Sequence, residues 1–455
     1  LLKQFTGSRK FLWIKKRISP EQQQQVQDIG EPGLLFGPRE MRLYPNGRLA
    51  AHILGGASFG REGVNAAELI GVAGVEKEFD SFLRDPANAS APLQLSIDLT
   101  VQAAAERVLA GGMKLMNARG AASVLMDVKT GEIISMVSLP DFDPNQRPTP
   151  LTKGQAADSP LFNRAVQAVY ELGSTFKIFT VAQALDIDLV QPDTLIDTRG
   201  PLVWGKYRIR DFRNYGDSLT VSKVLIKSSN IGAARIATMI GAERQRAFLA
   251  SLGLLSPTSV ELVEAPGIRP LEPDNWSEIS TMTIAYGHGI SVSPLHLAAA
   301  YASVVNGGTL VQPTLIKSAE IQNGPRVVSV KTSAIAASLL RQVVTRGTAS
   351  LGEVAGYAVG GKTGTADKPD LVNGGYYEDK VIATFASVFP ANDPKYVLIV
   401  SLDEPVETSG TAPRRTAGWT AVPVAAEMIG RIAPLLGLRP EIEPSASDGV
   451  TLTSY

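Results

Sequence analysis

Residues 171–186 read Glu-Leu-Gly-Ser-Thr-Phe-Lys-Ile-Phe-Thr-Val-Ala-Gln-Ala-Leu-Asp, a short turn followed by a nearly unbroken apolar run. The run from Phe176 to Leu185 is apolar on nearly every face of a helix, which predicts a helix buried in the interior. Lys177 is the only charge within the run, and Ser174 precedes it by one helical turn. The Ser174 hydroxyl and the Lys177 amine are therefore expected on the same helix face, within reach of each other.

This pair can carry chemistry if the lysine is neutral. Burial and the positive end of the helix dipole both disfavour an ammonium, so the pKa of Lys177 is expected to fall. A neutral amine can take the proton of Ser174, a serine–lysine form of nucleophilic catalysis that needs no histidine. The alternative is that Ser174 only caps the helix and Lys177 extends its amine to solvent, since Ser-x-x-Lys occurs often by chance.

Two further short motifs follow along the chain. Ser228 and Asn230, within Lys-Ser-Ser-Asn-Ile-Gly, are two residues apart on a predicted turn and offer a proton relay and an amide for a peptide-like substrate. A turn that simply caps the next helix is the alternative. The third motif, after two glycines, is Lys362-Thr363-Gly364-Thr365, and its small residues suit a strand that another main chain approaches closely.

A second Lys-Thr-Gly, at residues 129–131, has a simpler interpretation. It lies between two apolar runs, where the glycine supplies a positive φ at a hairpin tip and solvent takes the lysine. The three histidines, His52, His288 and His296, lack metal-ligand spacing and are interpreted as structural. Arg414 is interpreted with its neighbour Arg415 as a solvated loop pair. The sequence predicts no metal and no cofactor.

The composition limits the class of protein. The chain has 455 residues, with 44 Lys+Arg against 44 Asp+Glu and no Cys. A net charge of zero argues against a nucleic-acid binder with a broad basic surface. The lack of Cys excludes disulfides and cysteine nucleophiles but leaves the compartment open. The chain begins with Leu1 and has no membrane-length apolar run, so an anchor outside this chain is expected.

Stretches rich in Gly, Pro and small polar residues indicate how the chain divides into domains. Residues 1–91 are expected to form a truncated, partly extended N-terminal pedestal, with a helix capped by Ser19 and a small polar linker at 86–92. Residues 92–436 are expected to form the main domain, and residues 437–455 a poorly packed tail.

Within the main domain, two hairpins and several helices are predicted. The hairpins are residues 123–138 and 381–402, near opposite ends of the domain, which indicates one sheet built from distant pieces. A helix is predicted from Leu99 to Met116, and residues 161–350 are predicted to be mostly helical. A final helix is expected from Thr416 to Leu436, with Trp419 among its apolar residues.

The motifs Ser-x-x-Lys, Ser-x-Asn and Lys-Thr-Gly, in this order, are those of penicillin-binding proteins and serine β-lactamases. The chain resembles a class B penicillin-binding protein of the cell-division type, most visibly in Gly71-Val-Ala-Gly-Val-Glu-Lys-Glu-Phe-Asp80, Leu95-Ser-Ile-Asp98 and Tyr286-Gly-His-Gly289. The resemblance implies an α+β fold: a central antiparallel sheet with helices on both faces, a helical subdomain and a smaller N-terminal pedestal.

The resemblance also implies roles for the motif residues. Ser174 would attack a D-Ala-D-Ala stem peptide to form an acyl-enzyme, with Lys177 as base, Ser228 as proton shuttle and Asn230 as amide clamp. The residues Lys362, Thr363, Gly364 and Thr365 would hold the substrate carboxylate and shape the pocket. Backbone N–H groups of Ser174 and Thr365 would form the oxyanion hole.

The biology implied is septal cell-wall synthesis in the periplasm, with a single-pass anchor in the inner membrane. Expected partners are peptidoglycan stem peptides, covalent β-lactam antibiotics, a membrane glycosyltransferase and division proteins, but no nucleic acid. Two alternatives stay open: a serine β-lactamase or penicillin sensor, and a non-catalytic division scaffold. The length of the main domain favours the transpeptidase over a compact hydrolase, and three complete motifs argue against the scaffold.

Overall fold

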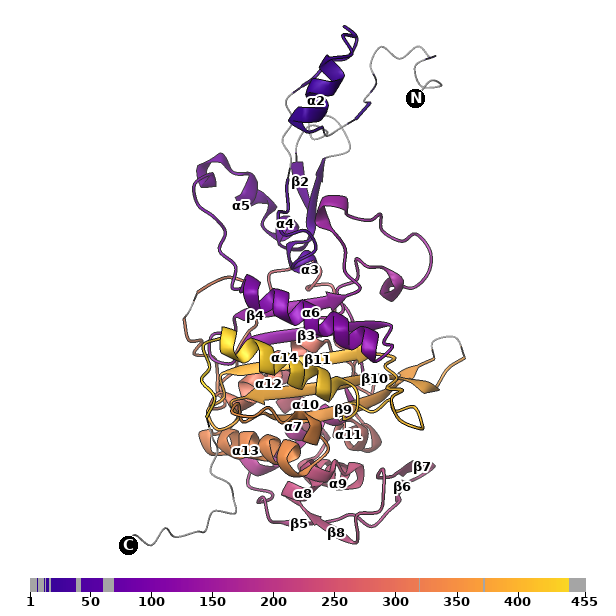
Figure 1. The fold of residues 1–455 in the computed structure, drawn as a ribbon. Helices are drawn as coiled ribbons and strands as arrows, with labels where there is room; N and C mark the ends of the chain where they lie inside the picture. Colours follow the sequence, from indigo (N-terminus) through magenta and orange to yellow (C-terminus); the bar gives the residue numbers. More distant parts are fainter. Residues whose placement is uncertain are drawn as a thin grey trace, which may run out of the picture.

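The computed structural model describes residues 6, 12, 14–15, 18–37, 42–59, 69–318, 320–370 and 373–441. Among these residues, every helix is too short or too polar to cross a lipid bilayer. The described chain stands as a tall body with the N-terminal elements at one end and small strands at the other (Figure 1).

A five-stranded antiparallel sheet forms the centre, in the order β4-β3-β11-β10-β9. Its strands are β3 (Gly120–Asp127), β4 (Ile133–Leu139), β9 (Gly360–Pro369), β10 (Tyr376–Phe389) and β11 (Tyr396–Asp403). The two predicted hairpins are β3–β4 and β10–β11, and they meet where β3 pairs with β11. The expected sheet of distant pieces is thus confirmed.

Helices cover both faces of this sheet, as predicted. The helices α6 (Leu99–Leu115) and α14 (Ala421–Leu435) pack on one face, in front in Figure 1, and α12 (Pro294–Val305) lies behind. Asp98 caps α6, because its carboxylate accepts the backbone N–H groups of the first turn. Val424 of α14 fills the space that a Cβ at Gly112 of α6 would occupy.

The final helix begins later than predicted. It starts at Ala421, so the expectation of a helix from Thr416 is wrong for its first residues. Trp419 precedes the helix and is 45% exposed, with the Arg414 guanidinium 4.0 Å above its ring. Arg414 also donates to Glu407 at 2.7 Å, so this arginine, whose side chain is 32% exposed, is ion-paired and not free in solvent as expected.

Helices are the main regular elements between the two hairpins, but they cover less than half of residues 161–350, so the prediction that this region is mostly helical is wrong in extent. It contains the 3-10 turn η5 (Gly173–Phe176) and the helices α7 (Lys177–Asp186), α8 (Val221–Lys227), α9 (Asn230–Ile240), α10 (Ala242–Ser251), α11 (Glu278–Ile284) and α13 (Val330–Arg346). It also contains four short strands that the sequence did not predict: β5 (Leu195–Asp197), β6 (Leu202–Trp204), β7 (Tyr207–Ile209) and β8 (Ser218–Thr220). They pair as β5–β8 and β6–β7.

The N-terminal elements form a small unit above the sheet (Figure 1). They are α2 (Pro20–Gln27), α3 (Ala51–Leu54), β1 (Gly56–Phe59), β2 (Leu69–Ala73), α4 (Gly74–Glu78), α5 (Asp80–Arg84) and the turn η2 (Pro86–Asn88). Ser19 caps α2 as predicted. Three further 3-10 turns are η3 (Pro144–Gln146), η4 (Ala156–Asp158) and η6 (Ser350–Gly352). Of the predicted tail, residues 442–455 lie outside the described residues.

Candidate active site

The serine and lysine of the first motif lie where η5 leads into the buried helix α7. The Lys177 Nζ atom lies 2.9 Å from Ser174 Oγ. Gly173 has a φ of 56°, and a Cβ at this position would press on the main chain of Thr365. Glycine therefore lets the turn that carries Ser174 approach the strand that carries the third motif.

The second motif is a bend between two helices. Ser228 ends α8 with a φ of 62°, a left-handed conformation, and Ser229 caps α9 by accepting a backbone N–H. This bend turns both functional side chains toward the same lysine. The Lys177 Nζ atom lies 3.0 Å from Ser228 Oγ and 2.7 Å from Asn230 Oδ1.

The third motif brings a second lysine to the same hydroxyl. On β9, the Lys362 Nζ atom lies 2.9 Å from Ser228 Oγ and 3.0 Å from the carbonyl oxygen of Thr363. A Cβ at Gly364 would overlap the carbonyl oxygen of Leu172, so only glycine lets β9 lie against η5. Ser228 Oγ is therefore the point at which the three motifs meet.

Burial sets the protonation of the two lysines. Both side chains are fully buried, at 0% exposure. Burial lowers the pKa of Lys177 well below its usual value, the nearby charge of Lys362 lowers it further, and Asp211 raises it. Burial lowers the pKa of Lys362 to about 7. Burial and mutual repulsion therefore both favour a neutral amine in this pair, which is the form that a general base needs.

The hydrogen bonds show how a neutral Lys177 can act as a base. Its amine donates to two groups that can only accept, the carbonyl oxygen of Ser228 at 2.6 Å and Asn230 Oδ1 at 2.7 Å. The orientation of the Asn230 amide is fixed because its Nδ2 donates to the Arg210 carbonyl oxygen at 3.1 Å. A neutral amine has two N–H groups, so its lone pair remains to accept the proton of Ser174.

Asp211 holds the second motif in place, and the sequence analysis missed it. Its carboxylate accepts the backbone N–H groups of Asn230 at 2.6 Å and Ile231 at 3.0 Å, and the Ser229 hydroxyl at 2.7 Å. A carboxylate at the first turn of α9 is favoured by the helix dipole. No spacing rule links residue 211 to this helix, because β8 and α8 lie between them in the chain.

Glu171 forms a second group that the sequence analysis did not single out. Its Oε1 accepts from the Gly289 backbone N–H at 2.7 Å and from the Tyr376 hydroxyl at 3.0 Å, and Oε2 lies 3.3 Å from His288 Nδ1. Burial raises the pKa of Glu171, but the bonds from His288 and Gly289 outweigh it and hold that pKa below its usual value. These contacts tie β10 to the chain three residues before Ser174.

Comparison with known proteins identifies the family. Residues 121–427 match the transpeptidase domain of penicillin-binding proteins, and residues 2–90 match the penicillin-binding protein dimerisation domain. The probable peptidoglycan D,D-transpeptidase FtsI of Caulobacter vibrioides is 36% identical over 94% of this chain and 71% of its own length. The chain belongs to the class B penicillin-binding proteins. It is accordingly an enzyme of the D,D-transpeptidase class, similar to the cell-division members.

Other relatives of this penicillin-binding protein agree. The peptidoglycan D,D-transpeptidase FtsI of Escherichia coli K12 is 28% identical over 95% of this chain and 74% of its own length. The transpeptidase domain of penicillin-binding protein 3 from Burkholderia pseudomallei is 34% identical, with a TM-score of 0.67 over 78% of this chain and 99% of that chain. Penicillin-binding protein 3 from Mycobacterium tuberculosis, solved with ampicillin, is 28% identical, with a TM-score of 0.76 over 89% of this chain and 91% of that chain.

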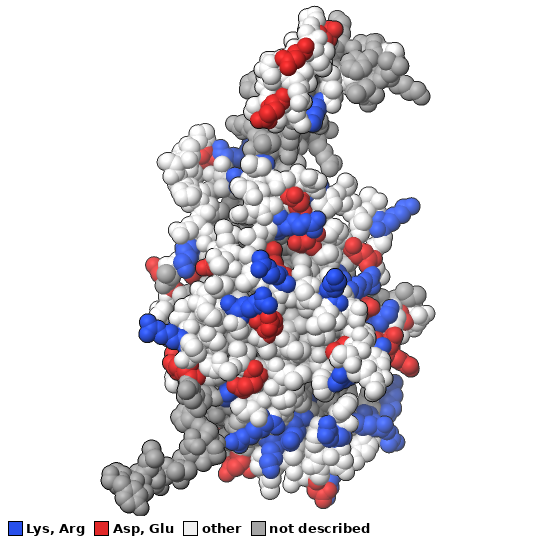
Figure 2. Space-filling view, viewed as in Figure 1, with Lys and Arg blue, Asp and Glu red and all other residues white. Residues whose placement is uncertain are grey.

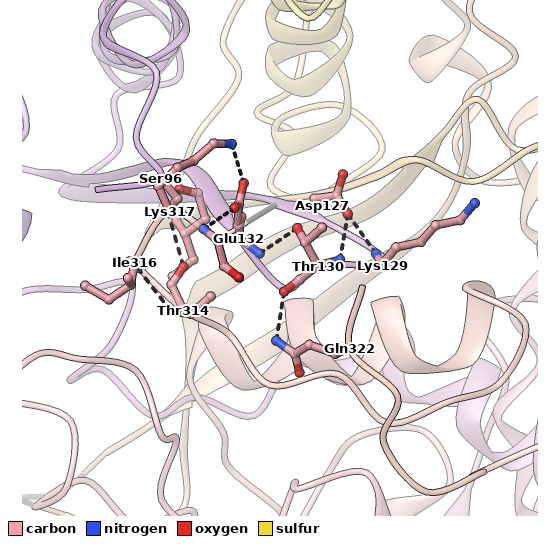
Figure 3. Close-up of polar contacts among 11 residues, drawn as sticks. Ser96, Asp127, Lys129, Thr130, Glu132, Thr314, Ile316, Lys317 and Gln322 are labelled. Atoms are coloured by element: carbon pink, nitrogen blue, oxygen red, sulfur yellow. Dashed lines mark hydrogen bonds and ion pairs between the residues drawn. The ribbon is translucent and has the colours of Figure 1, made fainter. Parts of the chain in front are cut away.

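The other Lys-Thr-Gly of this penicillin-binding protein is a structural turn. Figure 3 shows the Asp127 carboxylate accepting the backbone N–H groups of Lys129 at 2.8 Å and Thr130 at 2.9 Å. The Gln322 amide donates to the Thr130 carbonyl oxygen at 2.8 Å. The exposed Lys129 side chain points away from this network (Figure 3). The backbone φ angle of Gly131 is 75°, which is the left-handed conformation that the hairpin interpretation required.

The described residues contain no group of three or more His, Asp or Glu side chains placed to hold a metal ion. His52 and His296 are buried among backbone carbonyl groups, with ring nitrogens near the carbonyl oxygens of Pro140 and Ser256 at 3.3 and 2.9 Å. His288, by contrast, lies beside Glu171, three residues before Ser174 in the chain.

Proposed function

We propose that this protein cross-links peptidoglycan through an acyl-enzyme on Ser174. The observation that carries the proposal is the 2.9 Å contact between Ser174 Oγ and the Nζ atom of Lys177, a lysine with a lowered pKa. The neutral amine takes the Ser174 proton as Oγ attacks the carbonyl carbon of the penultimate D-Ala. The terminal D-Ala leaves, and its amine nitrogen takes a proton as the peptide bond breaks.

Other residues of the cluster would serve the same reaction. Ser228 Oγ lies within 3.0 Å of both lysine amines and would pass the proton to the leaving amine. The charged Lys362 and the hydroxyls of Thr363 and Thr365 would hold the terminal carboxylate of the substrate. The backbone N–H groups of Ser174 and Thr365 would stabilise the oxyanion, which typically supplies about 3 to 4 kcal/mol per donor.

In the second half of the reaction, an amine of a neighbouring stem peptide attacks the acyl carbon, and the neutral Lys177 takes a proton from this amine as the new amide bond forms. Ser174 Oγ leaves and receives that proton from Lys177. The same acylation step explains why β-lactams, which present a carbonyl of similar geometry, would block the enzyme as stable adducts on Ser174.

A peptide assay tests this function. Purified protein is incubated with a donor stem pentapeptide and an acceptor amine, and free D-Ala and the cross-linked product are measured. The expected result is both products from the wild type and neither from Ser174→Ala. A Ser174→Ala protein that still released D-Ala would refute the proposal. Rapid turnover of a fluorescent penicillin would show a β-lactamase instead.

We also propose that the enzyme works in the periplasm, held to the inner membrane, with a glycosyltransferase and division proteins as partners. The support is its family and its similarity to the division-type relatives. Fractionation of cells expressing the full-length gene tests this location, because the protein should be in the membrane fraction and be digested by protease only after the outer membrane is opened.

A further inference from the structure

A second surface of unusual composition lies near the catalytic cluster, by which we mean Ser174, Lys177, Ser228, Asn230 and Lys362. We call it the basic–aromatic ridge, and it consists of exposed residues of β6, β7 and the loop that follows: Trp204, Lys206, Tyr207, Arg208, Phe212 and Arg213. The chain as a whole has zero net charge, so this excess of cations is local. Figure 2 shows Lys and Arg gathered at the lower right of the molecule, where Figure 1 places β6 and β7.

The ridge side chains are open to a ligand. Trp204, Tyr207 and Phe212 are 40%, 50% and 85% exposed, which is costly for large rings. The Lys206 Nζ atom lies 5.5 Å from the centre of the Tyr207 ring. In the part of the chain that is described, the charged groups of Lys206, Arg208 and Arg213 pair with no carboxylate, whereas Arg199 and Arg235 both pair with Asp197.

The ridge is joined rigidly to the catalytic cluster. Ile209 at the end of β7 is buried against Ile231 and Ala234 of α9. The next residue, Arg210, accepts the Asn230 amide through its carbonyl oxygen at 3.1 Å. The residue after that is Asp211, which caps α9. The ridge therefore lies only a few residues along the chain from the groups that hold Asn230.

A groove extends the ridge on its other side. It has a volume of about 550 Å³ and runs between β6 and α9, with Trp204 on one wall and Met239 and Arg235 on the other. Small-molecule sites in proteins commonly have volumes of roughly 300 to 1,000 Å³ and combine apolar walls with a few polar groups. The groove has this character, because its walls are mainly apolar and its charged groups are Glu278 and the pair that Arg235 forms with Asp197.

We propose that the ridge and this groove bind a nascent, uncross-linked peptidoglycan strand. The pyranose rings of the glycan would stack on Trp204 and Tyr207, whose flat faces suit the C–H surface of a sugar. The carboxylates of the stem peptides would pair with Lys206 and Arg208. The site keeps a donor peptide near Ser174 between reactions, and in this respect it rests on the proposed transpeptidase function.

Strand binding measured apart from acylation tests the site. The ligands are soluble glycan strands with intact stem peptides and the same strands after an amidase has removed the peptides. The ridge variants are Lys206→Glu with Arg208→Glu, and Trp204→Ala with Tyr207→Ala. The matched control combines Lys129→Glu and Lys331→Glu, two exposed lysines on other surfaces. Each protein is also labelled with a fluorescent penicillin.

The charge-reversal variant should bind intact strands about tenfold more weakly, a loss that high salt conceals, and the aromatic variant should lose affinity for both kinds of strand. The control and all penicillin-labelling rates should stay at the wild-type level. Unchanged affinity in both ridge variants, or an equal loss in the control, would overturn the site. So would a ridge variant that changed only self-association in sedimentation, because the ridge would then be a contact between copies.

The two proposals fail separately. A wild type that binds strands through the ridge but forms no adduct with penicillin would refute the Ser174 chemistry and leave the ridge in place. If the wild type forms the adduct but the ridge variants bind strands as tightly as it does, the ridge site is refuted and the Ser174 chemistry stands.

Discussion

Lys177 and Lys362 share one hydroxyl, and burial lowers the pKa of both amines. Each positive charge disfavours the other, so the two amines titrate as a coupled pair. Lys177 lies beside Ser174, where a neutral amine can take a proton, and Lys362 reaches Ser228 Oγ from β9.

Replacing Lys362 should change the pH at which Lys177 works. In Lys362→Gln the positive charge that disfavours the Lys177 ammonium is gone, so the pKa of Lys177 should rise. The acid limb of the rate of acylation by a fluorescent penicillin should then move to higher pH. Lys362→Arg keeps the charge and serves as the control. An acid limb that stays in place in Lys362→Gln would contradict the assigned coupling.

Asp211→Asn should have the opposite effect on the same profile. The carboxylate favours the Lys177 ammonium, so its removal should lower the pKa of Lys177 and move the acid limb to lower pH. The helix cap should also weaken, at a cost of about 1 kcal/mol in the free energy of unfolding. Asp217→Asn, an exposed aspartate in the same region, is the control. A loss of stability with an unmoved profile would mean that Asp211 acts only structurally.

Sequence alone could indicate the motif residues because their spacing is local or their order is typical of a family. Ser174 and Lys177 are one helical turn apart, and the structure brings them together with Ser228, Asn230 and Lys362. Asp211 and Glu171 could not be found this way. Their partners lie on other elements, and a lone Asp or Glu in a loop has many uses. The roles of all these residues stay predictions until they are tested.

At the scale of elements, the close contact between β9 and η5 aligns the motifs. Gly364→Ala should force these two elements apart, because the new Cβ would overlap the Leu172 carbonyl oxygen. We expect acylation to slow at least a hundredfold, in line with the effect of an error of about 1 Å in active-site geometry. Penicillin labelling measures the rate, and circular dichroism checks that the fold persists.

Gly111→Ala is the matched control for that substitution. Gly111 lies in α6 with open space around a Cβ, so alanine should stabilise the protein by up to about 1 kcal/mol and leave labelling unchanged. If Gly364→Ala labels as fast as Gly111→Ala, the close contact does not matter for the site.

Periodicity predicted the long elements and failed for the short ones. The hairpins β3–β4 and β10–β11 alternate or run apolar over seven residues or more, and both were found. The strands β5 to β8 have three residues each, which is too short for a pattern to appear in the sequence. The early residues assigned to α14 include Trp419, whose ring is held by Arg414 and not by the core.

At the scale of the whole molecule, the N-terminal unit is held to the main body by specific polar contacts. The Tyr44 backbone donates to Asn145 Oδ1 at 3.0 Å and accepts from Asn145 Nδ2 at 2.9 Å. The Gly74 backbone N–H donates to Glu264 at 2.9 Å. The placement of a domain boundary near residue 91 is still a prediction.

Asn145→Ala should loosen this unit without affecting the catalytic cluster. Two hydrogen bonds are lost, so the docked state should weaken by about 1 to 3 kcal/mol. Limited proteolysis should then cut the 86–92 segment faster than in the wild type, while penicillin labelling stays the same. Asn373→Ala, in the turn between β9 and β10, is the control. Unchanged proteolysis would show that the two hydrogen bonds do not hold the unit.

The central claim is that Ser174 becomes acylated with Lys177 as its base. The most direct measurement is the intact mass of the protein after reaction with a penicillin, followed by peptide mapping of the adduct. The account predicts one antibiotic per chain, attached to the peptide that contains Ser174, no adduct in Ser174→Ala and a greatly slowed one in Lys177→Ala. An adduct on any other residue, or one that forms as fast without Lys177, would contradict it.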